Sequence, residues 1–183
     1  MKTTVAPQVT TWNIDPAHSV AEFKVKHMMI SNVKGRFVGI KGSLSLDDED
    51  VTQSQVEGSI DAASLNTHEP QRDTHLKSPD FFDAEKFPSL SFRSSRIARS
   101  GDGELEVTGD LTIRGVTRSV VFTVDGPSAP AKDPWGNVRL GLAASTKINR
   151  KDFGLTWNAA LETGGLLVGD EVSINLELQF VKA

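Results

Sequence analysis

Apolar and polar residues alternate along most of the chain, the pattern of strands with one buried and one solvent-facing side. After Ser19, for example, Ala21, Phe23 and Val25 are apolar, and the residues between them are charged. Stretches with this period of two follow one another without the long helical crossovers that a parallel sheet needs. The pattern predicts about eight antiparallel strands, within residues 19–27, 33–46, 56–62, 90–93, 105–113, 120–124, 138–148 and 172–180.

The stretch from Val33 to Leu46 predicts one long strand with an irregularity. Its apolar residues fall on odd positions up to Phe37 and on even positions from Val38 onward. A change of phase requires an extra residue in one strand, and glycine is the residue type that tolerates such a corner. We therefore expect a bulge or corner at Gly39.

The alternation stops between Leu65 and Pro88, where the residues become charged and the segment ends in three phenylalanines. Asn66 or Thr67 is expected to cap a short helix that ends at Ser78, since a proline follows. Such a helix has few apolar residues and is expected to lie on the surface near one end of the β structure.

Eight meandering strands favour an all-β, up-and-down antiparallel barrel, because closure removes the exposed sheet edges. We expect a single domain over residues 11–183, preceded by a flexible arm at 1–10. Small residues on the inward faces leave room for a long apolar tunnel that could hold an aliphatic chain. The alternative is a closed core or a β-sandwich. The small inward residues are Gly35, Gly58, Ala62, Gly109 and Ala144.

Composition removes several function classes. The chain has 183 residues, a net charge of −4 and no cysteine, which excludes disulfides, thiol catalysis and cysteine metal sites. A negative net charge disfavours nucleic acid as a partner. The N-terminus has no apolar signal-peptide core, so a cytoplasmic location is expected as written, or a periplasmic one if a leader was removed.

Sequence motifs for catalysis, cofactors and metals are missing. The chain has no G-x-S-x-G, no phosphate-binding P-loop and no G-x-G-x-x-G after a strand, so no cofactor is expected. The spacing of the four histidines does not suit one metal ion. These are His18, His27, His68 and His75.

Four motifs, in order and at suitable spacing, resemble the YceI-like, polyisoprenoid-binding family. They lie within His18–Phe37, Arg72–Phe92, Gly109–Thr117 (GDLTIRGVT) and Asn149–Gly154 (NRKDFG), and the resemblance runs from about Trp12 to Phe180. It implies an extended lipocalin-like barrel with a helix near one end and no catalytic residues. It also implies a long amphiphilic ligand, such as a polyprenyl chain, an isoprenoid quinone, a fatty acid or a fatty amide.

We therefore predict noncovalent binding of a long-chain lipid inside the barrel, for carriage, storage or sequestration. The alternatives are an enzyme acting on a lipid or quinone, with His27 or His75 as acid or base, and a protein-interaction barrel. The residues predicted to line the ligand site are Phe23, Val25, His27, Phe37, Phe92, Leu111, Ile113, Phe122, Leu142 and Leu176.

The barrel mouth has two interpretations. Arg72 and Asp73 could fix the helix to the rim by charge-assisted bonds, or Arg72 and His75 could receive an anionic head group. His27 is likewise either a hydrogen-bonded interior histidine or a contact to the head group.

The aromatic and arginine positions near the mouth are also open to two interpretations. Phe81, with Phe82 and Phe87, is predicted to form either a hydrophobic gate or a satellite core. Arg150 and Asp152 are interpreted as a structural pair. The hydrophobic tip Met28-Met29-Ile30 is a candidate contact for a partner or for a homodimer.

Overall fold

The computed structural model describes residue 6 and residues 8–183 of the chain, which form twelve strands, one α-helix and four short 3-10 turns. The helix is α1 (Pro70–Lys77), and the 3-10 turns are η1 (Pro16–His18), η2 (Val51–Gln53), η3 (Ala62–Ser64) and η4 (Arg150–Phe153). The strands are β1 (Val9–Ile14), β2 (Val20–His27), β3 (Ser31–Phe37), β4 (Ile40–Asp47), β5 (Gln55–Asp61), β6 (Leu65–Asn66), β7 (Ser89–Arg99), β8 (Glu104–Ile113), β9 (Val116–Asp125), β10 (Ala131–Lys132), β11 (Val138–Asn149) and β12 (Val168–Lys182).

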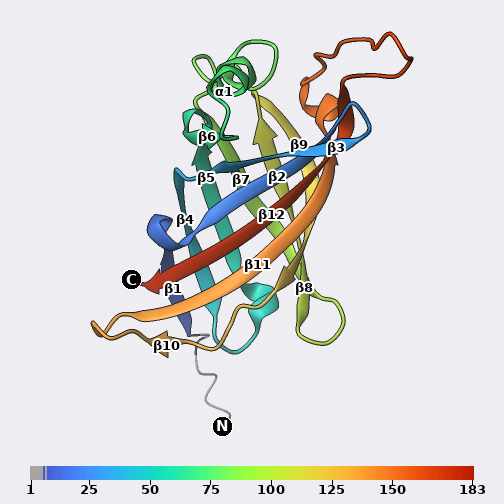
Figure 1. Ribbon diagram of the computed structural model, residues 1–183. Helices are drawn as coiled ribbons and strands as arrows, with labels where there is room; N and C mark the ends of the chain where they lie inside the picture. Colours follow the sequence, from blue (N-terminus) through green and yellow to red (C-terminus); the bar gives the residue numbers. More distant parts are fainter. Residues whose placement is uncertain (1–5, 7) are drawn as a thin grey trace.

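The sheet closes on itself because β11 pairs with both β9 and β12 (Figure 1). β1 and β2 pair with successive parts of β12 and together act as one long strand of the barrel wall. β4 pairs with β1, and β3 pairs with β2, so β3 and β4 together act as the next long strand. Each wall strand is antiparallel to its neighbour in the chain. The predicted eight-stranded up-and-down barrel is confirmed.

The first wall strand begins slightly earlier than expected. Val9 and Thr10, which the sequence assigned to the flexible arm, are the first residues of β1. Their backbones pair with Asp47 and Leu46 of β4, which explains why they are ordered into the sheet. The rest of the predicted arm, apart from residues 6 and 8, lies outside the described residues.

The predicted corner at Gly39 is confirmed, but the strand there is divided in two. β3 ends at Phe37 and β4 begins at Ile40. The carbonyl of Gly39 accepts a hydrogen bond from the Asp61 N–H at 2.8 Å, which fixes the corner against the next strand. Val38 was expected to point inward, but it is 53% exposed because it sits in the gap between the two strands.

α1 lies across one end of the barrel, as predicted (Figure 1), and none of its side chains is buried. The predicted cap at Asn66 or Thr67 is wrong. The cap is Glu69, whose carboxylate accepts hydrogen bonds from the N–H groups of Gln71 (3.2 Å) and Arg72 (2.7 Å). Asn66 is instead part of β6, where it pairs with β3.

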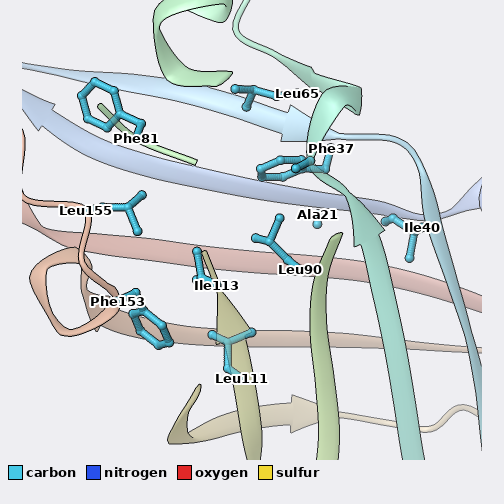
Figure 2. Packing of buried hydrophobic residues seen from close by; sticks show 11 residues of the cluster. Ala21, Phe37, Ile40, Leu65, Phe81, Leu90, Leu111, Ile113, Phe153 and Leu155 are labelled. Carbon is cyan, nitrogen blue, oxygen red and sulfur yellow. The ribbon is translucent and has the colours of Figure 1, made fainter. Parts of the chain in front are cut away.

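Buried side chains form three clusters inside the barrel. The largest lies toward α1 and joins inward residues of the strands to Phe81, Phe153 and Leu155 from the loops (Figure 2). A second cluster lies on β7, β8, β9 and β11. The third lies at the end opposite α1 and contains Trp12, Leu44, Leu46, Leu140 and Phe180. We call this third cluster the closed end.

Two of the small inward residues do not leave empty space. A Cβ atom at Gly35 would overlap the ring of Phe23, and one at Gly109 would overlap the ring of Phe92. Phe23 is the direct cross-strand partner of Gly35, so the ring covers the glycine that faces it. The expectation that glycine means open room is therefore wrong at these positions, where an aromatic side chain fills the gap.

Candidate functional site

The barrel encloses a cavity of about 390 Å³ that is lined almost entirely by apolar side chains. Its lining extends from Leu46, Val51 and Leu105 on the side of the closed end to Arg72 and His75 on α1. The ten residues predicted to line the ligand site lie on this lining, as do the three candidates at the mouth, Arg72, His75 and Phe81. The structure therefore brings the predicted set together around one space, while contact with a ligand stays a prediction.

Several inward side chains remain partly accessible although they point into the barrel. Leu142, Ile174 and Leu176 belong to this group, and all three line the cavity. Leu140 precedes Leu142 on the same face of β11 but is only 2% exposed. The interior is therefore packed around Leu140 at the closed end and open toward the mouth. A guest can make contacts there that the protein's own side chains do not make.

Aromatic rings gather where α1 and the following loop meet the barrel. The ring of His75 stands edge-on to Phe81 and Trp157, with centroids 5.1 and 4.7 Å away. The Asp80 carboxylate accepts a hydrogen bond from His75 Nε2 at 2.9 Å, and this bond fixes the orientation of the imidazole ring. All three rings line the cavity, and we call this set the mouth cluster.

Sequence reasoning missed Trp157, because it lies in a loop without periodicity. The signal in the sequence was an apolar residue on each side of Thr156, namely Leu155 and Trp157. Leu155 is buried in the main core cluster, so the loop after η4 is tied to the barrel interior.

Arg72 and Asp73 both bind Thr67. Arg72 Nε donates to Thr67 Oγ1, and its Nη2 donates to the Thr67 carbonyl, each at 2.8 Å. Asp73 accepts from the Thr67 N–H at 2.8 Å. These bonds fix α1 next to β6, as the structural interpretation predicted. Arg72 also lines the cavity, so its role toward a head group stays a prediction.

The three phenylalanines of the segment between Leu65 and Pro88 do not form one group. Phe81 is 6% exposed and belongs to the main core, and Phe82 packs edge-on against Phe37 at 5.6 Å. Both line the cavity. Phe87 instead lies close to Gly115 in the β8–β9 turn and is not part of the lining. A gate made of all three rings is therefore not what the structure shows.

Arg150 organises the loop that carries Trp157. Its side chain is 4% exposed, and it donates to the carbonyls of Leu155 (2.7 Å), Trp157 (2.9 Å) and Gly169 (2.8 Å). Asp170, 3.8 Å away, is its ion-pair partner, so the predicted pair with Asp152 is wrong. Burial lowers the pKa of the Arg150 guanidinium, and the charge of Asp170 opposes that shift.

His27 lines the cavity at the end of β2, and within the described part of the chain its ring makes no hydrogen bond. The interpretation of a hydrogen-bonded interior histidine is therefore not supported, and contact with a head group stays a prediction. No three His, Asp or Glu side chains among the described residues converge as metal ligands would. Among these residues no helix is long and apolar enough to cross a membrane.

The sequence is similar to that of known proteins. The model of the YceI-like domain matches residues 12–180. A UPF0312 protein of Vibrio cholerae is 40% identical over 139 residues, which are 76% of this chain and 73% of that protein. A UPF0312 protein of Staphylococcus aureus is 34% identical over 172 residues, 94% of this chain and 98% of that protein.

Solved structures agree. BcnA of Burkholderia cenocepacia has a TM-score of 0.76 at 26% identity, covering 91% of this chain and 98% of its own. The YCEI protein of Campylobacter jejuni has a TM-score of 0.72 at 30% identity, covering 87% of this chain and 91% of its own. A polyisoprenoid binding domain from Saccharophagus degradans has a TM-score of 0.69, covering 96% of this chain and all of its own, but at 16% identity it shows the fold alone. This chain belongs to the YceI-like family.

Proposed function

We propose that the barrel binds one long-chain amphiphile noncovalently and carries, stores or sequesters it. The observation that carries this proposal is the apolar cavity of about 390 Å³ inside a closed barrel. Volumes of this order are typical of small-molecule sites, and a wall with few polar groups favours a hydrocarbon guest. The hydrophobic effect would supply most of the affinity.

The expected affinity follows from the length of the chain that enters. Each buried methylene contributes about 0.8 kcal/mol, so a 15-carbon chain could gain about 12 kcal/mol before the cost of ordering it. Every additional isoprene unit inside the barrel should therefore tighten binding, until the chain reaches the closed end.

The ligand class we favour is an isoprenoid, such as a polyprenyl chain or an isoprenoid quinone. A structural relative is named a polyisoprenoid binding domain, which supports this choice. A fatty acid or fatty amide is the alternative, because the same apolar wall would accept a straight chain. The polar head would lie at the mouth, near Arg72 and His75 on α1, and His27 at the end of β2 lines the same cavity.

We expect the protein to bind its ligand without transforming it. His75 is oriented by Asp80, but its remaining neighbours are the rings of Phe81 and Trp157 rather than a nucleophile. A ligand recovered from the protein with the same mass as the one supplied would support this view. Recovery of a converted product that disappears in His75→Gln would establish the enzyme alternative.

The direct test is native mass spectrometry of the purified protein before and after organic extraction, with mass spectrometry of the extract. A stoichiometric prenyl, quinone or fatty species is expected. Leu176→Trp should block uptake by filling the cavity, whereas Val121→Trp, on the outer face where Val121 is 47% exposed, should not. A folded protein that is empty and refuses all three lipid classes in titration would overturn the proposal.

A further inference from the structure

The β2–β3 hairpin ends in an exposed apolar tip. Met28, Met29 and Ile30 are 40%, 67% and 79% exposed. The N–H of Met28 donates to the carbonyl of Leu167 at 2.8 Å, which holds the tip against the loop that follows η4. Leu166 on that loop is 44% exposed. Four apolar side chains from two loops are thus presented to the outside at one place.

The backbone of the tip makes these side chains unexpected. Met28 and Met29 adopt φ angles of 52° and 61°, in the left-handed region that hairpin turns normally fill with Asn, Asp or Gly. Two long apolar side chains therefore break the local rule at a position where both stay exposed. Such departures concentrate at functional sites.

The strands below the tip carry an uncompensated positive charge. Lys24 on β2 lies directly opposite Lys34 on β3, a like-charge pairing that disfavours the sheet. Lys26 follows on the same outward face. Within the described residues, none of these three lysines is in ion-pair range of a carboxylate, whereas the nearby Arg36 pairs with Glu22 at 3.0 Å. A protein with a net charge of −4 thus presents a basic face here.

The tip, the lysines and the barrel mouth are continuous. Lys24, Lys26, Met29 and Leu166 border one shallow surface depression. Lys26 and Val168 also line the barrel cavity, so the two hollows share a wall. In Figure 1 the β2–β3 connection lies beside the loop between η4 and β12, at the same end of the barrel as α1.

The acidic residues of the depression do not cancel this charge, because each has a cation of its own. Asp170 lies 3.3 Å from Lys151, and Glu171 lies 3.6 Å from Lys147. The free charge that remains at the tip is positive.

We propose that this face docks the barrel on an anionic phospholipid bilayer. Met28, Met29, Ile30 and Leu166 would enter the interface between head groups and acyl chains, and Lys24, Lys26 and Lys34 would bind the anionic head groups. A bilayer fits because exposed apolar side chains stand next to lysines without ion-pair partners among the described residues, the combination by which a surface inserts into the interface and binds anionic head groups. The inference rests on the proposed function for its purpose, since docking would place the barrel mouth against the lipid phase.

The test is flotation with vesicles of phosphatidylcholine containing about 30% phosphatidylglycerol, alongside vesicles of phosphatidylcholine alone. Binding is expected to the anionic vesicles and to fall as salt is raised. Lys24→Gln, Lys26→Gln and Lys34→Gln together should lower the partition coefficient about 100-fold, at roughly fivefold for each lysine. Met29→Ser with Ile30→Ser should lower it at least about tenfold.

Matched controls lie at the other end of the barrel. Trp135 is 82% exposed, and Lys132 is exposed on β10, which lies at the end opposite α1 in Figure 1, so Trp135→Ser and Lys132→Gln remove an apolar and a basic surface group far from the tip. Both variants should bind vesicles like the wild type. Equal losses in tip and control variants would overturn the proposal. So would a wild-type dimer in sedimentation that the tip variant dissociates, because the tip would then be a subunit contact.

Ligand content, measured by native mass spectrometry without vesicles, separates the two proposals. Tip and lysine variants that keep their ligand but lose the vesicles support docking. A wild type that carries ligand but ignores anionic vesicles overturns docking and leaves the proposed function intact. A wild type that binds the vesicles through the tip but never carries lipid supports docking and overturns the proposed function.

Discussion

The two ends of the barrel are built from the same strands but differ in how they are filled. At the closed end Trp12, Leu140 and Phe180 are 2%, 2% and 0% exposed, and they pack against one another. At the mouth, His75 and Trp157 reach the barrel from α1 and from a loop, and they line the cavity.

This difference indicates that the residues that stabilise the fold and those available for binding lie at different levels along the barrel axis. On β11, Leu140 faces Phe180 and is packed, while Leu142, one inward position further along, borders the cavity. The alternation of apolar residues is the same for both. The closed end can therefore stabilise the fold while the mouth end leaves surface for a guest.

The largest effect is expected from the arginine that holds the mouth. Arg150→Met should lower the free energy of unfolding by about 3–5 kcal/mol, because it leaves several carbonyls and Asp170 without their buried partner. Denaturant unfolding measures this loss. The control is Arg99→Met, whose ion pair with Asp50 is exposed and should be worth less than about 1 kcal/mol. A loss below about 1 kcal/mol for Arg150→Met would mean that the loop does not need it.

Two leucines on β11 test the comparison directly. Leu140→Ala should cost about 3–4 kcal/mol, since it leaves a void in a packed cluster. Leu142→Ala should cost about 1–2 kcal/mol, because its side chain already borders open space and loses fewer contacts. Denaturant unfolding of the lipid-free protein measures both losses in the free energy of unfolding. Equal costs would show that the barrel collapses around an empty cavity in solution.

Acid should weaken the closed end through one arginine. Arg139 donates to Asp133 and Asp15 at 2.7 Å each, and these bonds, ahead of other causes, lower the pKa of both carboxyls to about 2. A depressed carboxyl pKa stabilises the fold above its ordinary value of 3.8, and this stabilisation is lost as the pH falls toward about 2.

The wild type should therefore be more stable than Arg139→Met at pH 5, and the gap should narrow between about pH 4 and pH 2. Thermal unfolding at a series of pH values measures it. A gap that stays constant through this window would contradict the role given to Arg139.

The smallest effect compares two histidines that each pair with a carboxylate. His75 pairs with Asp80 at 2.9 Å and lines the cavity, whereas His18 pairs with Asp15 at 2.8 Å outside it. His75→Gln should weaken lipid binding by about 1–2 kcal/mol if it contacts the head group. His18→Gln should leave the lipid dissociation constant unchanged in the same titration. Equal affinities for the two variants would remove His75 from the head-group site.

Local sequence patterns predicted the wall of the site well. Every strand residue predicted for the ligand site lies on the cavity lining, because side-chain direction in a strand alternates with a period of two whatever the strand pairs with. The interruption of that period located the helix and the corner at Gly39 for the same reason. The helix cap was misplaced because the Thr67 hydroxyl donates to the side chain of Asp73 and accepts from no backbone N–H of the helix, whereas Glu69 accepts from two.

Sequence alone determined the strands, their inward faces and the exposed tip at Met28–Ile30, since all of these follow from residues that are neighbours in the chain. Only the tertiary structure decided which inward positions are filled and which are open. Phe23 covers Gly35 from the next strand, and Arg150 finds its partners in the loop and in β12. These contacts depend on the register between strands and on the closure of the barrel. Register and closure are properties of pairs of segments, so the sequence of one segment does not determine them.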